Sequence, residues 1–254
     1  MISTPINYPD GSTVVLDFDP KKHYYNVEGK YVPSVTTVLN VIAKPALMPW
    51  AVKMGAEWFV KNCEAFEQAE LSQEDMVKGI KTAYREVSDD ALLVGRMVHD
   101  YCEAAINWKL GRGEAPGMPD NEAAESSINA FRAWVRENDV EFISSEEKVY
   151  SREHNYAGTI DAVANVNGEF SVVDFKTSAR IYNTYYIQCA AYAQCVKEVY
   201  DKEIDMSYIL RFDKKTGAFE VGKAVETAEN FRAFRGFQEG YLRLTEMDNR
   251  SKRK

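Results

Sequence analysis

The segment GTIDAVANVNGEFSVVDFKTS, from Gly158 to Ser178, constrains the fold of this chain more than any other stretch. It holds two runs rich in Ile, Val, Ala and Phe on either side of Asn167-Gly168. This dipeptide suits the positive φ angles of a two-residue hairpin turn, and its flanks are strong β-formers. We therefore predict an antiparallel β-hairpin.

The register of this hairpin would place Asp161 directly opposite Asp174. Their Cβ atoms would lie about 4.5–5.5 Å apart, where like charges destabilise a sheet. At an effective dielectric constant near 20, the repulsion is roughly 3 kcal/mol. Lys176 follows Asp174 by two residues, so it lies on the same face of the strand and could offset the repulsion. Val163 and Val172 share that face, which favours a partly buried cleft over a solvent-exposed hairpin.

Two opposed carboxylates beside a lysine suit the binding of a hard divalent cation through oxygen, Mg²⁺ or Mn²⁺ above all. Such a cation would remove the repulsion, activate a water molecule and polarise a phosphoryl oxygen. Lys176 could orient the attacking water or stabilise the developing negative charge. A surface hairpin whose lysine pairs with the acids is the alternative, and the spacing alone supports the two about equally.

The composition excludes several classes of protein. The chain has 254 residues, 45% hydrophobic and 28% charged, which is typical of a soluble globular protein. No apolar run approaches the length needed to span a bilayer, and the N-terminus does not resemble a signal peptide. The net charge of −8 argues against a protein that coats nucleic acid non-specifically. The four cysteines form no CxxC pair, so neither a zinc site nor an iron–sulfur cluster is expected, and reduced cysteines favour a cytoplasmic compartment.

The pattern of elements changes near residue 140. Before it we expect short N-terminal strands, a turn at Glu28-Gly29, a helix capped by Ser34, and helices at about 47–69, 72–87, 89–110 and 119–138. After it we expect three strands, a helix at about 182–200, two more strands and a helix at about 226–247. The fold class is therefore α+β, with helices on a mixed sheet.

A resemblance adds to this interpretation. Gly158-Thr159-Ile160-Asp161 and Asp174-Phe175-Lys176-Thr177 resemble the PD-(D/E)XK nuclease signature, in the form found in its RecB-like exonuclease branch. The resemblance implies a restriction-endonuclease-like core, a mixed central β-sheet flanked by helices, with a helical N-terminal subdomain. We place a boundary between an N-terminal hairpin and helical region, 1–88, and a nuclease core, 89–254, which could also fold as one unit.

Three further features match the same branch. Gly95–His99 resembles its GxxxH helix motif, in which the histidine reaches the metal, and Glu103 lies one helical turn further on, where it could support the histidine or a metal water. Gln188 and Tyr192 are similar to its QxxxY motif. Relatives also carry a supporting acid on the strand before the hairpin. Glu146 and Glu147 both fit this place, and we prefer Glu147.

The resemblance implies a metal-dependent DNA exonuclease of phage type, acting at DNA ends and preferring single strands, with the mitochondrial genome maintenance exonuclease as a broader relative. Its metal ligands would be His99, Asp161, Asp174 and the Phe175 carbonyl, and Lys176 would position the water. Gln188, Tyr192, Arg180 and Arg211, with Lys214 and Lys215, are the candidates for DNA contacts. Helices before residue 140 would arch over the cleft, with Trp50, Trp58 or Tyr24 stacking bases, although such aromatics more often belong to a core.

Two other functions stay open. One is a structure-specific or nicking endonuclease that uses the same site, and the other is a non-catalytic DNA-binding or assembly protein that keeps the fold. Phage-type relatives often work beside recombination or replication proteins in a bacterial or phage-infected cell, so such partners are expected, in DNA recombination or DNA repair. The iron–sulfur subgroup is not expected, because its C-terminal cysteine cluster is missing from the sequence.

Overall fold

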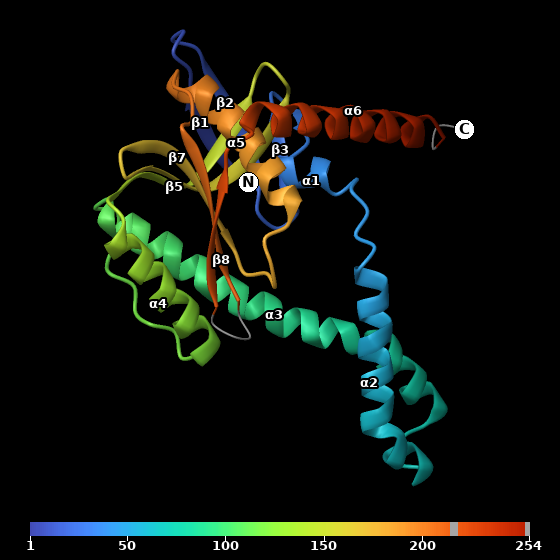
Figure 1. The fold of residues 1–254 in the computed structure, drawn as a ribbon. Coiled ribbons are helices and arrows are strands. Elements are labelled where there is room, and N and C mark those ends of the chain that lie inside the picture. Colours follow the sequence, from blue (N-terminus) through green and yellow to red (C-terminus); the bar gives the residue numbers. More distant parts are fainter. Residues whose placement is uncertain (214–217, 252–254) are drawn as a thin grey trace. The chain divides into compact units, whose positions relative to one another are not determined.

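The computed structural model describes residues 1–213 and 218–251, apart from the side chains of residues 90 and 91. The chain divides into two compact units (Figure 1). One contains Met1–Ile42 and Met97–Lys254, and the other contains Ala43–Arg96. Among the described helices, none combines the length and the apolar composition that crossing a bilayer requires.

The first sheet of the larger unit is built from the N-terminal strands. It is antiparallel in chain order: β1 (Ile2–Asn7), β2 (Thr13–Asp19), β3 (Tyr24–Val27) and β4 (Lys30–Val32). The expected turn at Glu28-Gly29 is confirmed, since both residues have positive φ angles. The sequence did not predict β1, because Pro5 interrupts the run of strand-forming residues. A proline is tolerated here because β1 is an edge strand.

The second sheet has five strands in chain order: β5 (Val140–Ser151), β6 (Tyr156–Val166), β7 (Glu169–Lys176), β8 (Met206–Phe212) and β9 (Phe219–Ala224). All neighbours are antiparallel except β7 and β8, which are parallel and joined through helix α5 (Asn183–Tyr200) (Figure 1). The sheet is therefore mixed, as the sequence predicted.

The β6–β7 hairpin forms as the sequence predicts. Val166 pairs with Glu169, and between them Asn167 and Gly168 have φ angles of 53° and 84°. Positive φ at both turn positions is the type I′ geometry that matches the twist of the strands. The pairing register continues to Ala162–Val173, one position short of the two aspartates.

The helices follow the predicted pattern with one exception. Ser34 caps α1 (Val35–Leu39) by accepting a hydrogen bond from the Thr37 amide. The others are α2 (Leu47–Glu67), α3 (Gln73–Lys109), α4 (Glu122–Glu137) and α6 (Thr227–Ser251). The predicted break near Ser88 is wrong, because α3 runs through that position. No proline interrupts this stretch, and Ser88 is tolerated inside a helix that already begins at the capping residue Ser72.

A large part of the core of the larger unit lies between the five-stranded sheet and helices α5 and α6. α5 packs across β5, β7 and β8, and α6 packs on α5. Tyr156 of β6 stacks edge-on against Phe234 of α6 at 4.8 Å and donates its hydroxyl to the Ala191 carbonyl of α5. Val163 and Val172 are fully buried in the same cluster. The helices that follow the hairpin thus bury Val163 and Val172, the two valines that share a face with Asp161 and Asp174.

The smaller unit, Ala43–Arg96, packs α2 against the first part of α3. Gly79 lies against the ring of Trp58, where a Cβ would come within 2.2 Å of the indole, and the rings of Trp50 and Tyr84 meet edge-on at 6.4 Å. Tyr24, in the larger unit, packs against Tyr31. All three aromatic residues that were candidates for base stacking therefore have packing partners within their own units.

We expect Gly158→Ala to lower the free energy of unfolding by about 1–3 kcal/mol, because it overpacks the core. A Cβ at this position of β6 would stand 2.7 Å from Cε1 of Tyr192 and 3.5 Å from Cγ2 of Val35. Urea denaturation measures the loss. Gly113→Ala is the matched control, since a Cβ there meets nothing within 4 Å. Equal stability of the two variants would contradict the close packing of α5 on β6.

Candidate active site

Three potential metal ligands converge beside the hairpin. His99 of α3, Glu146 of β5 and Asp161 of β6 each offer a ligand atom, and these atoms lie within 4.8 Å of one another. Strand pairing explains the approach of the two acids: Ser145 pairs with Ala162 and Glu147 with Ile160, so Glu146 stands opposite Asp161.

The orientation of His99 leaves one ring nitrogen facing the acids. Its Nε2 lies 3.0 Å from the Phe175 carbonyl oxygen, and because a carbonyl can only accept, Nε2 must carry the hydrogen. In the neutral ring the lone pair is then on Nδ1, which lies 4.0 Å from Oδ1 of Asp161. This carbonyl contact fixes the tautomer that a metal ligand needs. It also gives the Phe175 carbonyl a partner other than the expected metal.

Asp161 is held in place by the neighbouring strand. Its Oδ2 accepts a hydrogen bond from the Phe175 amide at 2.6 Å. That contact leaves Oδ1 directed toward His99. The carboxylate therefore bridges β6 to β7 on one side and faces the imidazole on the other, which is a preorganised position for a ligand.

Asp174 and Lys176 form a buried ion pair on β7. The Lys176 Nζ lies 2.6 Å from Oδ2 of Asp174, whose side chain is 2% exposed. Burial, with the nearby charge of Asp161, raises the pKa of Asp174, although Lys176 opposes the shift. Burial alone would lower the pKa of Lys176, but the attraction of both aspartates outweighs it and raises that pKa. Lys176 is therefore a charged donor at neutral pH.

Glu146 adopts a backbone conformation that is uncommon for a residue with a side chain. Its φ angle is 48°, in the left-handed region, and such residues cluster at functional sites. Burial, and then the charge of Asp161, raises the pKa of Glu146 to about 7; the charge of Glu103 contributes to the same shift. Glu103 thus lies close enough to add negative charge to the group. A cation bound between these acids would relieve the repulsion that raises the pKa.

Glu147, the preferred supporting acid, has other partners. Its carboxylate accepts hydrogen bonds from the Tyr200 hydroxyl at 2.9–3.0 Å and from the Ser144 hydroxyl. These contacts tie β5 to the end of α5. The geometry thus places Glu146 in the group and Glu147 in a bridge between a strand and a helix, a distinction that two adjacent glutamates do not reveal in sequence.

This geometry predicts opposite effects for the two glutamates. We expect Glu146→Gln to weaken Mn²⁺ binding by about tenfold or more, with little loss of stability, because it removes a ligand charge. We expect Glu147→Gln to spare Mn²⁺ binding and to lower the free energy of unfolding by about 1–3 kcal/mol, because Tyr200 and Ser144 lose a charged acceptor. Calorimetric titration and urea denaturation of both variants measure the two effects. If Glu147→Gln weakened Mn²⁺ binding and Glu146→Gln lowered stability, Glu147 would be the metal ligand and Glu146 the structural residue.

Gln188 and Tyr192 are buried on α5 and contact each other. The Gln188 amide donates to the Tyr192 hydroxyl at 3.1 Å, and the two residues are 8% and 4% exposed. The Tyr192 ring packs on Gly158, three residues before Asp161. We therefore propose that this pair stiffens the strand that carries Asp161, in place of the direct DNA contact expected from the motif.

The two arginine candidates differ in their surroundings. Arg211 is 6% exposed, and its guanidinium pairs with Asp213 and Glu220 and donates to the carbonyls of Ser178 and Ala179. We propose that it anchors the loop after β7 and does not contact phosphate. Arg180 is exposed on that loop, with its guanidinium 4.9 Å from the ring centre of Tyr182. It keeps its place as a candidate phosphate contact, and Lys214 and Lys215 lie outside the described residues.

A second cluster of acids and histidine has a structural explanation. Glu153, His154 and Glu198 could geometrically hold an ion. However, the Glu198 carboxylate accepts hydrogen bonds from the Ser151 hydroxyl and from the amides of Arg152 and Glu153. It therefore holds the turn between β5 and β6. The cysteines are free thiols, with Cys102, Cys189 and Cys195 buried.

The donor set of the first group fits a divalent cation. Carboxylate oxygens are the ligands that Mg²⁺ and Mn²⁺ prefer, and a neutral imidazole nitrogen adds tolerance for Mn²⁺. His99, Glu146 and Asp161 would hold it. Asp174, the other carboxylate expected to bind the cation, is not one of these three residues, and its side chain is paired with Lys176. When bound, the cation would supply Lewis acidity to a phosphoryl oxygen and to water.

Two solved structures are similar to part of the chain. One is the "Putative exonuclease" of Eubacterium rectale, with 16% identity and a TM-score of 0.42 over 61% of this chain and 67% of that one. The other is an alkaline exonuclease from Laribacter hongkongensis, with 10% identity and a TM-score of 0.32 over 62% of this chain and 92% of that one. No curated protein matches the chain.

The family model described as the PD-(D/E)XK nuclease superfamily matches residues 57–251. This range contains both aspartates of the hairpin, Lys176, His99 and Glu146. Because the match spans well over half of the sequence, the chain belongs to the PD-(D/E)XK nuclease superfamily.

Proposed function

We propose that the protein is a deoxyribonuclease that requires Mg²⁺ or Mn²⁺ and removes nucleotides from the ends of DNA, preferring single strands. The observation that carries the proposal is the convergence of His99, Glu146 and Asp161 within 4.8 Å, next to the buried pair of Asp174 and Lys176. Residues that could hold a cation, a charged lysine beside them and membership of a nuclease superfamily together favour phosphodiester hydrolysis over DNA binding without catalysis.

The residues have separable parts in this reaction. His99 and the acids hold the cation, and the Phe175 backbone positions two of them, through its carbonyl to His99 and its amide to Asp161. Lys176 stays protonated beside Asp174, so it acts as a donor that orients the attacking water or stabilises charge on the phosphate, and not as a proton acceptor. Arg180, exposed on the loop after β7, offers a contact to the DNA backbone.

A nuclease assay tests the proposal. The substrates are end-labelled single-stranded and double-stranded DNA, each blocked in turn at its 5′ or 3′ terminus, with Mg²⁺, Mn²⁺ or EDTA. We expect hydrolysis with either cation, none in EDTA, faster digestion of the single strand, and protection when one particular terminus is blocked. Absence of hydrolysis under every cation condition would remove the enzymatic proposal and favour a non-catalytic DNA-binding or assembly protein.

A covalently closed single-stranded circle separates exonuclease from endonuclease. An enzyme that needs a terminus leaves the circle intact while it digests a linear strand of the same sequence. Degradation of the circle at a similar rate would assign the same residues to a structure-specific or nicking endonuclease.

A further inference from the structure

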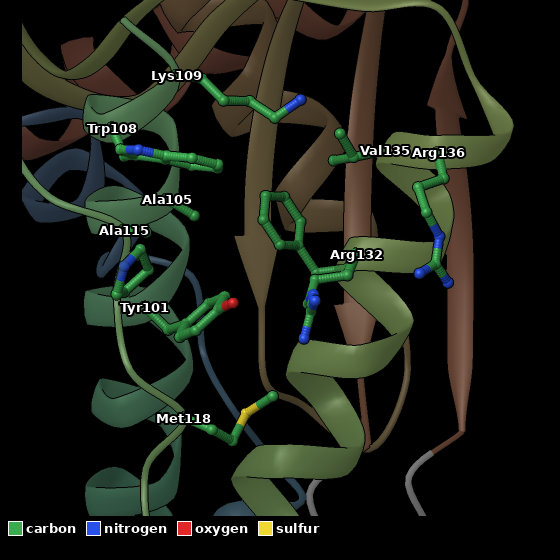
Figure 2. Close-up of a pocket in the computed structure, with 11 residues that line it drawn as sticks. Tyr101, Ala105, Trp108, Lys109, Ala115, Met118, Arg132, Val135 and Arg136 are labelled. Atoms are coloured by element: carbon green, nitrogen blue, oxygen red, sulfur yellow. The ribbon is translucent and has the colours of Figure 1, made fainter. Parts of the chain in front are cut away.

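A pocket of about 360 Å³ opens between the C-terminal part of α3 and helix α4 (Figure 2). Its volume falls at the lower end of the roughly 300–1,000 Å³ that is usual for small-molecule sites. Its lining combines three aromatic rings with three cationic side chains and contains no acidic residue. These six residues are Tyr101, Trp108, Phe131, Lys109, Arg132 and Arg136.

Trp108 presents an unusual amount of surface for its type. It is 50% exposed, whereas Trp134 on α4 is 5% exposed. Figure 2 shows its ring extending from α3 toward α4. Within the part of the chain that the structure describes, no other aromatic ring packs against it. The indole therefore has surface available for a flat ring to stack on.

The cations of the pocket are not neutralised by the protein. Arg132 and Arg136 are four residues apart on α4, so they lie on one face of that helix, and Lys109 lies on α3. Among the described residues, none of the three has an acidic group within ion-pair distance. In a chain of net charge −8, this concentration of unpaired positive charge favours an anionic ligand.

The pocket is distinct from the metal-binding group. At 3.6 residues per turn, Tyr101 and Trp108 lie about 200° and 180° around α3 from His99, on the other side of the helix. Phe131 links the two regions, because its ring packs edge-on against Phe175 at 5.6 Å, and the Phe175 carbonyl contacts His99. A ligand in the pocket would therefore bind near the hairpin without touching the cation.

We propose that this pocket binds one unpaired nucleotide, with its base stacked on Trp108 and its phosphate facing Arg132, Arg136 and Lys109. A flat ring joined to an anion matches both halves of the lining, and base–aromatic stacking tolerates any sequence. The base must be unpaired, because a base inside a duplex is covered on both faces. The choice of DNA as ligand rests on the proposed nuclease function. The nucleotide can come from a DNA strand or from a free mononucleotide.

Binding measured without hydrolysis tests this site. The probes are a fluorescein-labelled oligo(dT) 12-mer, read by anisotropy, and dTMP as an unlabelled competitor, both in EDTA at fixed salt. We expect Trp108→Ala to weaken binding of the 12-mer by roughly 5- to 100-fold, and Trp108→Phe to retain most of the affinity. We expect Arg132→Gln to weaken binding and to make it less dependent on salt. Arg232→Gln is the control, because it removes an equal charge from an exposed position on α6.

The two sources of the nucleotide give different results. If the site takes a DNA strand, dTMP displaces the 12-mer only at far higher concentration; if it takes a free nucleotide, dTMP binds as tightly and depends equally on Trp108. Either result supports the pocket. Folded Trp108→Ala and Arg132→Gln variants with unchanged affinity, or a wild-type protein that binds neither probe, would overturn it. Hydrolysis of DNA by the wild-type protein in Mn²⁺ would then leave the proposed function standing.

Discussion

Replacing Lys176 by methionine should reduce the rate of DNA hydrolysis by about 100- to 10,000-fold. Methionine keeps the length and most of the packing of the lysine stem but removes its charge. The Nζ of Lys176 lies 2.6 Å from Oδ2 of the buried Asp174, and the attraction of Asp174 and Asp161 raises the pKa of Lys176, which keeps it charged. In the proposed reaction, its loss removes the charged donor that orients the attacking water or stabilises charge on the phosphate, and single-turnover rates with saturating Mn²⁺ measure the effect.

Two controls separate this chemical effect from unfolding. Lys197→Met removes the same charge from an exposed pair with Glu203 on the surface of α5 and should leave the rate unchanged. Circular dichroism and a thermal melt should show that Lys176→Met is folded. Hydrolysis by the folded Lys176→Met variant at a rate close to wild type would remove Lys176 from the mechanism.

The β-hairpin could be predicted because its determinants are local. Asn167-Gly168 specifies the turn, and the period-two pattern of the strands then fixes which residues face each other. The capping of α1 by Ser34 is local in the same sense. Where the sequence specifies both the turn and the register, it also places Asp161 and Asp174 next to the last observed pair, Ala162–Val173.

Features that depend on distant packing could not be predicted in this way. Glu146 and Glu147 have the same chemistry, and only the left-handed backbone at Glu146 and the contacts of Glu147 with Tyr200 and Ser144 separate them. Arg211 has the composition of a phosphate ligand, but carbonyls and acids from outside its own strand surround it. No local pattern distinguishes an arginine that binds phosphate from one that binds a loop.

Trp108 illustrates the same limit for surface residues. The sequence does not distinguish Trp108 from Trp50 and Trp58, since all three lie in helical segments. The Trp58 ring packs against Gly79 and the Trp50 ring packs edge-on against Tyr84, whereas Trp108 is half exposed. The helix pattern alone predicts which face a tryptophan occupies, but whether a partner covers that face depends on the loop and helix that follow.

Asp161→Asn should weaken Mn²⁺ binding by about 10- to 100-fold or more. Removing a residue that only supports a metal ligand already costs about this much affinity, and Asp161 is itself a proposed ligand. Asparagine has nearly the same shape, and its side-chain oxygen can still accept the hydrogen bond from the Phe175 amide, so the strands should stay paired. What changes is the charge beside Nδ1 of His99, 4.0 Å from Oδ1. Calorimetric titration of Mn²⁺ into the wild-type protein and the variant measures the difference directly, without any substrate.

The second acidic cluster supplies the control for this titration. Glu153→Gln changes an exposed carboxylate in the group with His154 and Glu198, and should leave the Mn²⁺ affinity unchanged. If Glu153→Gln weakens binding and Asp161→Asn does not, the cation binds at the turn between β5 and β6, away from Lys176. If Asp161→Asn and Asp174→Asn both bind as tightly as wild type, the two aspartates hold no cation. The carboxylates of the hairpin would then serve only to pair with Lys176, and the proposal of a hydrolytic metal site would fail.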